Sequence, residues 1–202
     1  MAENRCQRAG PILILNLHSV HNSHRFWQTF YDRAAFLYDA VLRAGAWLRL
    51  GSEDRVRSEV IGMLEFPVGS RVIEMGCGTL LNRNHLPGSI QYIGVDISRG
   101  MLNKAQVRCK ELRFEADLVQ ADAVMLPFAS KAADATFAMG VLQHVEVPRI
   151  AIEQMERVTK TDGVIIVVDE RRAQKRILTK DMNARCKCIG EYFIVDYTNV
   201  KT

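Results

Sequence analysis

The sequence lacks an apolar run long enough to cross a membrane, and it lacks a strong excess of charge of one sign. Its apolar N-terminal stretch, residues 11–17, is short and has no small-residue cleavage site behind it, so we expect a docked strand or lead-in rather than a membrane span or signal peptide. Lys and Arg number 27 against 23 Asp and Glu, for a net charge of +4. These charges are scattered, and the densest basic stretch, residues 171–176, reads as a solvated helix face. A nucleic-acid partner is therefore not expected.

Cysteine is also scarce, and its spacing does not suggest a disulfide framework. The five cysteines are an odd number, and Cys77 lies inside a glycine-rich loop where a disulfide is implausible. Cys186 and Cys188 have no second Cys/His pair at zinc spacing, so no metal site is expected. We therefore predict a reduced, cytoplasmic protein. The sequence gives no indication of the oligomeric state.

What the sequence does contain is a change of hydrophobic period near residue 70. Apolar residues recur at helical spacing over residues 24–50 and 53–64. Short apolar strands and two further helices follow: strands at 71–75, 92–96, 117–120, 134–139 and 163–169, helices at 99–115 and 148–160. Apolar strands separated by helices predict a Rossmann-like, doubly wound α/β fold, with a mainly parallel sheet and helices on both faces.

The chain length suits one compact domain with two parts. Residues 1–52 are expected to form a lead-in and helical cap, and residues 53–202 the sheet domain. A late strand at 191–197 is expected to add to the sheet edge, with an antiparallel orientation as one option. Because the stretch after Cys186 is short, we expect this C-terminal edge to be reduced.

Three strand ends carry residues suited to a ligand. Open parallel sheets bind ligands beyond the carboxyl ends of their strands. The glycine loop Gly76-Cys77-Gly78 leaves main chain bare, Asp96 can accept both hydroxyls of a ribose, and Asp122 can read an adenine edge. Each has a plainer interpretation, respectively a strand–helix turn, a helix cap and a surface turn. Their order and spacing together indicate a nucleotide-type site.

These segments resemble the successive motifs of class I S-adenosylmethionine-dependent methyltransferases. The matching stretches are Val-Ile-Glu-Met-Gly-Cys-Gly-Thr at 72–79, Gly-Val-Asp-Ile-Ser at 94–98, the Asp122 segment through Phe128, and 134–145. The resemblance covers roughly residues 54–170. It is strongest to the ubiquinone/menaquinone-biosynthesis branch, because residues 31–39 resemble that branch's N-terminal helix, which lies over the cofactor.

The resemblance implies S-adenosyl-L-methionine as cofactor and assigns roles along the chain. The methionine part would be lined by the glycine loop and its preceding acid, the ribose held by one carboxylate, the adenine read at a later strand end, and the sulfonium approached from the fourth strand. The residues implied are Glu74, Gly76, Cys77 and Gly78 for the methionine part, Asp96 for the ribose, Ile97 against the adenine, Asp122 and Ala123 for the adenine edge, Met139 and Gly140 near the sulfonium, and Tyr38 for the cofactor carboxylate.

One position departs from the family pattern. Where a third glycine is usual, this chain has Leu80. Leu80 would narrow the pocket, weaken cofactor affinity or only reshape the loop. A binding protein that kept the fold and has weak or no turnover is therefore an alternative function.

The expected chemistry is methyl transfer to a small-molecule acceptor, by O- or C-methylation. Residues 137–140 read Phe-Ala-Met-Gly, unlike the Asn/Asp-Pro-Pro-Tyr signature of amino-directed nucleic-acid methyltransferases. His144 follows the fourth strand and is the candidate catalytic base, with a packing role as its alternative. The alternative of an RNA- or protein-directed methyltransferase is supported only by the basic residues 171–176. A nicotinamide oxidoreductase is disfavoured, because Leu81 stands where the dinucleotide fingerprint needs a glycine or alanine.

Overall fold

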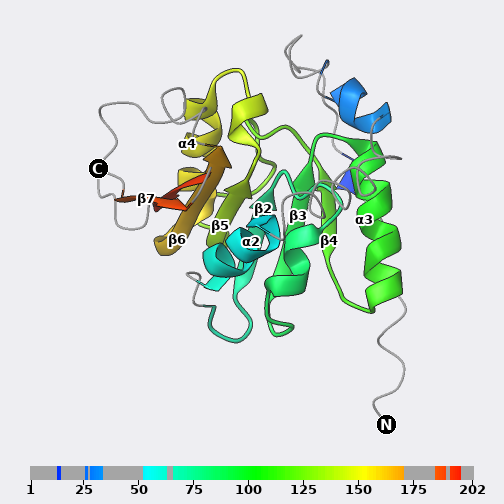
Figure 1. Cartoon of the computed structure of the whole chain (residues 1–202), viewed down its shortest axis with the longest axis horizontal. Coiled ribbons are helices and arrows are strands. Elements are labelled where there is room, and N and C mark those ends of the chain that lie inside the picture. The colour runs from blue at the N-terminus through cyan, green and yellow to red at the C-terminus, as the bar shows by residue number, and fades with distance from the viewer. Residues whose placement is uncertain are drawn as a thin grey trace.

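The computed structural model describes residues 13–14, 26, 28–33, 52–62, 66–170, 185–189 and 192–196. Residues 26 and 28–33 are helical and are called here the N-terminal helical segment. The other elements, labelled as in Figure 1, are β1 Leu13–Ile14, α2 Ser52–Gly62, β2 Arg71–Met75, η1 Leu81–His85, β3 Gln91–Asp96, α3 Arg99–Leu112, β4 Asp117–Gln120, β5 Ala133–Met139, η2 Leu142–His144, α4 Pro148–Val158, β6 Thr159–Glu170, β7 Arg185–Ile189 and β8 Tyr192–Asp196. Within these ranges, no helix is long and apolar enough to cross a membrane.

The described strands form one sheet in the order β1-β4-β3-β2-β5-β6-β8-β7. The strands from β1 to β6 pair in parallel, and the chain order reverses between β2 and β5. The mainly parallel, Rossmann-like sheet expected from the sequence is confirmed. The strands expected at 71–75 and 117–120 have the predicted bounds, and the helices expected at 99–115 and 148–160 end three and two residues earlier. The helix expected at 53–64 is described as far as Gly62.

Both edges of the sheet add detail to the expected fold. At one edge, Leu13 of β1 pairs in parallel with Val119 of β4, so part of the apolar stretch 11–17 is a docked strand. At the other edge, β8 runs antiparallel to β6 and β7 runs antiparallel to β8. The late strand is confirmed, but β7 joins it. The expected reduced C-terminal edge is therefore corrected to a two-stranded one.

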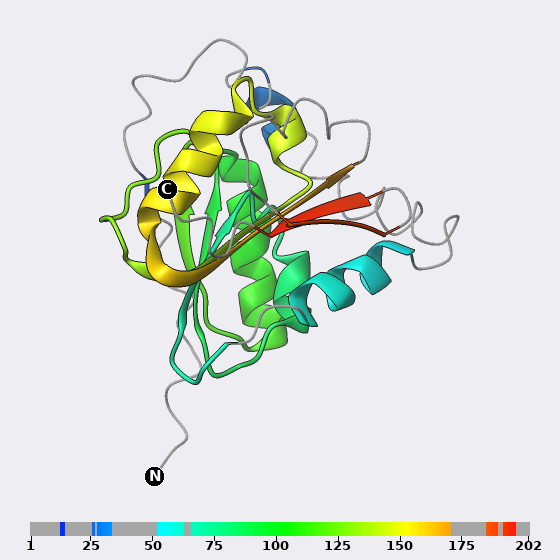
Figure 2. The same ribbon diagram turned by 90° about the vertical axis from the view of Figure 1, so that its left-hand side faces the viewer.

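The sheet separates two apolar layers, because neighbouring residues of a strand point to opposite faces. Ile73 of β2 packs with Ile152 and Met155 of α4, while Val72 packs on the other face with residues of α2 and α3. Figure 2 shows α4 on one side of the sheet and α2 and α3 on the other. Helices thus cover both faces, as expected.

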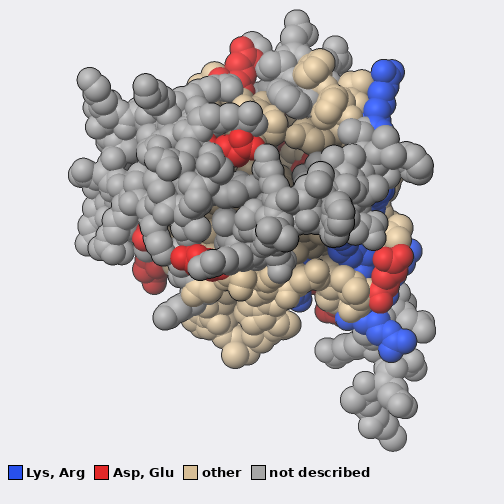
Figure 3. All heavy atoms as spheres, viewed as in Figure 1, with Lys and Arg blue, Asp and Glu red and all other residues tan. Residues whose placement is uncertain are grey.

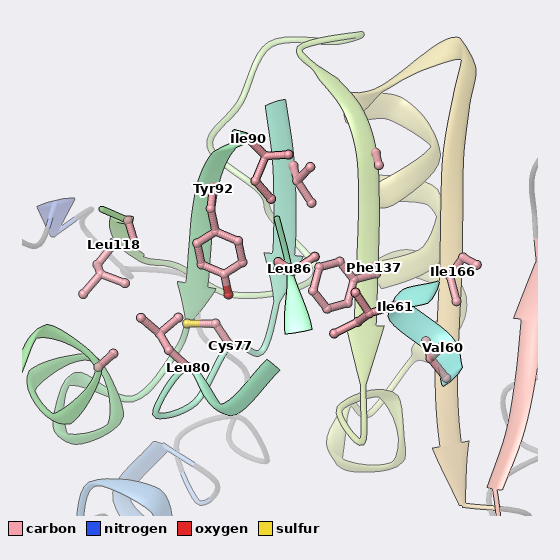
Figure 4. Close-up of a cluster of buried hydrophobic side chains, with 14 of the residues drawn as sticks. Val60, Ile61, Cys77, Leu80, Leu86, Ile90, Tyr92, Leu118, Phe137 and Ile166 are labelled. Carbon is pink, nitrogen blue, oxygen red and sulfur yellow. The ribbon is translucent and has the colours of Figure 1, made fainter. Parts of the chain in front are cut away.

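Two side chains on the α2/α3 face fit closely around one glycine of β3. A Cβ added at Gly94 would lie 2.8 Å from the Cys77 sulfur and 3.2 Å from Cδ2 of Leu80. Cys77 and Leu80 lie together beside Tyr92 in Figure 4. The glycine of β3 therefore provides the space into which the loop after β2 packs.

A buried polar network lies in the same layer. Glu74 is 1% exposed and accepts hydrogen bonds from Nδ2 of Asn82 (2.6 Å) and from the Tyr92 hydroxyl. Arg57 of α2 donates to Oδ1 of Asn82 at 2.5 Å. Burial raises the pKa of Glu74 to about 7, although the hydrogen bonds from Tyr92 and Asn82 and the charge of Arg57 oppose the rise.

Gly94→Ala should destabilise the protein by about 1–3 kcal/mol, because the added methyl overpacks the contact with Cys77 and Leu80. The free energy of unfolding, measured with chemical denaturant, checks this. Gly62→Ala is the matched control: no atom lies within 4 Å of its added Cβ, and it should be neutral or stabilising. A Gly94→Ala protein as stable as wild type would contradict the packing described.

Glu74 should make the protein less stable as the pH rises. Between pH 4.5 and about 7, unfolded Glu74 is ionised while the folded carboxyl keeps its proton. The free energy of unfolding of wild type should therefore fall, relative to Glu74→Gln, by up to about 1.4 kcal/mol per pH unit. Denaturant titrations of both proteins across this range test the sign. Parallel curves for the two proteins would show that folding does not raise the pKa of Glu74.

Candidate functional site

A pocket opens at the carboxyl ends of the central strands. Its empty volume, with the open mouth included, is about 800 Å³. Most of the residues predicted from the sequence lie in its lining: Gly76, Gly78, Asp96, Ile97, Asp122, Ala123, Met139, Gly140 and His144. The topology therefore brings the ends of β2, β3, β4 and β5 to one site, as the resemblance implies.

Three predicted residues are not found in this lining. Glu74 and Cys77 are buried on the α2/α3 side of the sheet. Successive side chains of a strand point to opposite faces of the sheet. Glu74 and Met75 are neighbours on β2, so they face opposite sides, and Met75 is the one that lines the pocket. Tyr38 lies outside the described residues. Glu74 and Cys77 thus lie beneath the loop rather than in the pocket lining, and their direct contact with the cofactor stays a prediction.

The loop after β2 brings bare main chain to the pocket. Gly76 has φ 72°, and a Cβ there would lie 2.2 Å from Cγ2 of Val141. The amides of Gly76 and Cys77 donate to the Val95 carbonyl at 2.7 and 2.9 Å. Only glycine fits this conformation and this contact together.

Asp96 fixes the loop as well as lining the pocket. Its Oδ2 accepts from the Gly78 amide and its Oδ1 from the Ser98 amide, both at 2.8 Å. Burial raises the pKa of Asp96 to about 6, the amides of Ser98, Gly78 and Ile97 oppose this, and the nearby carboxylate of Asp32 adds to it. A carboxylate has about four lone-pair sites, so beyond these three amides one site remains that a ligand hydroxyl can use.

Asp122 has a similar arrangement at the next strand end. It is 5% exposed, and its Oδ1 accepts from the Val124 amide at 3.1 Å. Its carbonyl accepts from the Met125 amide at 3.0 Å, which closes the turn. The turn thus holds a carboxylate and the adjacent Ala123 at the pocket wall.

The N-terminal helical segment spans the pocket between α3 and η2. Asp32 accepts hydrogen bonds at one oxygen from the Ser98 hydroxyl (2.6 Å) and the Gly100 amide (2.8 Å) at the start of α3. Tyr31 lines the pocket, and its hydroxyl lies 3.1 Å from Nε2 of His144 in η2. The two rings meet edge to face with centroids 5.8 Å apart. The position of Tyr31 at this site could be found from the sequence only through the residue 31–39 motif.

Leu80 does not narrow the pocket. Its backbone is left-handed, with φ 64° and ψ 36°, the conformation for which glycine is usual. Its side chain is fully buried among the apolar residues of the α2/α3 face, where Figure 4 shows it beside Cys77. A left-handed L-residue costs about 1–2 kcal/mol, whereas burying a leucine contributes about 1.5–3 kcal/mol, so the packing offsets the strain.

Other sequence features lie where the structure gives no description. The basic stretch 171–176 and the side chains of Cys186 and Cys188 are among them. Among the residues described, the lining also includes apolar side chains that the motifs did not indicate, namely Met75, Val95, Met101, Ala121, Val141 and Val145.

Comparison with known proteins agrees with this geometry. Residues 73–167 match the family described as methyltransferase domain. A demethylmenaquinone methyltransferase of Paenarthrobacter aurescens (strain TC1) is 31% identical over 142 residues, which are 70% of this chain and 53% of that protein. A phosphatidylethanolamine N-methyltransferase of Cereibacter sphaeroides is 31% identical over 103 residues, 50% of this chain and 51% of that protein. The chain thus spans about half the length of these relatives.

A solved structure shares the fold. A SAM-dependent methyltransferase from Aquifex aeolicus superposes with a TM-score of 0.58 at 14% identity, over 69% of this chain and 87% of that one. With the strand order, the pocket at the strand ends and the family match, this shows that residues 73–167 form a domain of the class I S-adenosylmethionine-dependent methyltransferases.

Proposed function

We propose that this chain is an active methyltransferase that moves a methyl group from S-adenosylmethionine to a small-molecule acceptor bearing a hydroxyl, by O- or C-methylation. The observation that carries the proposal is the hydrogen bond between the Tyr31 hydroxyl and Nε2 of His144 inside the pocket. A hydroxyl already lies at the candidate base, and an acceptor hydroxyl of the same kind can replace it. The demethylmenaquinone methyltransferase among the relatives supports a small organic acceptor.

The residues present fit the cofactor. A ligand would lie against bare main chain at Gly78 and Gly140, which have positive φ and no atom within 4 Å of an added Cβ. Asp96 would hold the ribose hydroxyls, and Asp122 with Ala123 would read the adenine edge. When bound, the cofactor supplies a methyl group attached to a positively charged sulfur. This sulfur is the leaving group, and its charge means that it needs no further activation.

The chain's own residues then have two tasks. Alignment of acceptor and methyl donor lowers the activation barrier by roughly 7–11 kcal/mol. The rigid ends of β2, β3 and β5 would provide this alignment. His144 would take the acceptor proton at Nε2 after the Tyr31 hydroxyl leaves that nitrogen. The N-terminal helical segment, held by Asp32 at α3, would exclude water from above. We therefore also propose residues 1–52 as the cap of the domain.

Two alternatives have less support. The strained backbone at Leu80 favours a protein that has the fold without turnover, but the side chain lies outside the pocket lining. An RNA- or protein-directed enzyme is not favoured by the described surface on the α3 side, where basic and acidic side chains are mixed in Figure 3.

The free thiols of Cys77 and Cys109 are consistent with the prediction of a reduced, cytoplasmic protein.

Methyl transfer should be detected with a panel of small hydroxyl-bearing aromatic acceptors and radiolabelled S-adenosylmethionine. His144→Gln should lower kcat by about 10²–10⁴-fold, the contribution of a positioned base. Its affinity for S-adenosylmethionine, measured by calorimetry, should stay at the wild-type value. His85→Gln, at the end of η1, is the matched control and should behave as wild type.

The same measurements separate the alternatives. Binding of S-adenosylmethionine without transfer to any acceptor of the panel would favour the protein without turnover. Absence of binding at high micromolar cofactor would contradict the cofactor assignment. Transfer that His144→Gln leaves unchanged would remove the base from the mechanism.

A further inference from the structure

A buried carboxylate lies at the end of β6, next to η2 and outside the pocket lining. Asp169 is 0% exposed. Its Oδ2 accepts a hydrogen bond from the Gln143 amide at 3.3 Å, its Oδ1 accepts from the Glu170 amide at 3.2 Å, and the Leu142 backbone also donates to it. Two of these three amides belong to η2. Burial raises the pKa of Asp169 to about 6, and the three amides oppose that rise.

The turn that Asp169 contacts is short and carries the candidate base. η2 spans only Leu142–His144, and its first flanking residue, Val141, makes no side-chain capping hydrogen bond. Within the turn, the His144 amide donates to the Val141 carbonyl at 2.9 Å. A single 3₁₀ turn has poor hydrogen-bond geometry and depends on outside contacts for its position.

The sheet places Asp169 next to the pocket. Met139, which lines the pocket, pairs with Val168 of β6, and the Gly140 amide donates to the Val168 carbonyl at 2.8 Å. Asp169 follows directly. Its carboxylate therefore lies between the rigid end of the sheet and the turn that carries His144.

We propose that Asp169 is a positioning residue: by accepting the first amides of η2, it fixes the turn and orients the His144 ring toward the pocket. This inference rests on the proposed function for the role of His144. A carboxylate suits this task because both of its oxygens accept, whereas an asparagine would turn an NH₂ group toward one of the amides. Hydrogen bonds to a charged acceptor are also stronger than neutral ones, which offsets the burial of the charge.

The test is Asp169→Asn, with Asp134→Asn as matched control. Asp134 also accepts a backbone amide, that of Arg71 at 2.8 Å, but it is at the opposite end of the sheet. Asp169→Asn should lower kcat for methyl transfer by about 10- to 100-fold, the effect of a misplaced catalytic group. Cofactor affinity should not change, and Asp134→Asn should leave both quantities at wild type.

A double-mutant cycle distinguishes positioning from an independent role. In a His144→Gln background, Asp169→Asn should cause no further loss of kcat, because its effect passes through His144. If the losses of the two variants multiply, Asp169 acts independently of His144 and the proposal is overturned. The proposal is also overturned if Asp169→Asn has wild-type kcat.

A spectroscopic measurement decides the proposal without turnover. The imidazole resonances of His144, observed by nuclear magnetic resonance, should move in Asp169→Asn and stay in place in Asp134→Asn. If the asparagine variant does not fold, Asp169→Glu replaces it, because its longer side chain displaces the acceptor oxygens and should also move these resonances. Unchanged resonances overturn the proposal. A protein that methylates no acceptor yet shows the shift would contradict the proposed function and keep Asp169 as the residue that orients His144.

Discussion

The site depends on the hydrogen bonds that join the loop after β2 to the end of β3. The Val95 carbonyl accepts the amides of Gly76 and Cys77, and the Asp96 carboxylate accepts the amide of Gly78. These bonds hold three consecutive residues in conformations that leave main chain exposed to a ligand. Gly76 combines a positive φ with no room for a Cβ beside Val141, so this position requires glycine, and the positive φ of Gly78 also favours glycine.

The packing beneath this loop explains how Leu80 is tolerated. The left-handed backbone at Leu80 sends the side chain into the apolar layer, away from the pocket. Gly94 on the neighbouring strand leaves the space that Leu80 and Cys77 fill. The departure from the family pattern is therefore compensated by packing on the far side of the sheet, and the pocket keeps its carboxylates and bare backbone.

The sequence was sufficient for the sheet and for most of the pocket lining, because both follow from local patterns. Strand ends can be read from apolar runs, and parallel strands bring their carboxyl ends together, which assembled Gly76, Asp96 and Asp122 correctly. The exchange between Glu74 and Met75 was missed because it depends on which face each strand residue takes next to a specific helix. β7 was missed because its sequence, Arg-Cys-Lys-Cys-Ile, has no continuous apolar run, unlike the Tyr-Phe-Ile-Val of β8.

Asp169 shows the remaining limit of sequence reading. In the sequence it is the last residue of an apolar strand, and its carboxylate would ordinarily be placed in solvent. In the fold it is fully buried, because η2 returns over the end of β6 and its amides need an acceptor. Asp32, Asp96 and Asp122 likewise accept backbone amides at the starts of turns or helices around the pocket. Carboxylates at these points both shape the loops and set the charge of the site, so a substitution that preserves size but not charge alters the geometry as well.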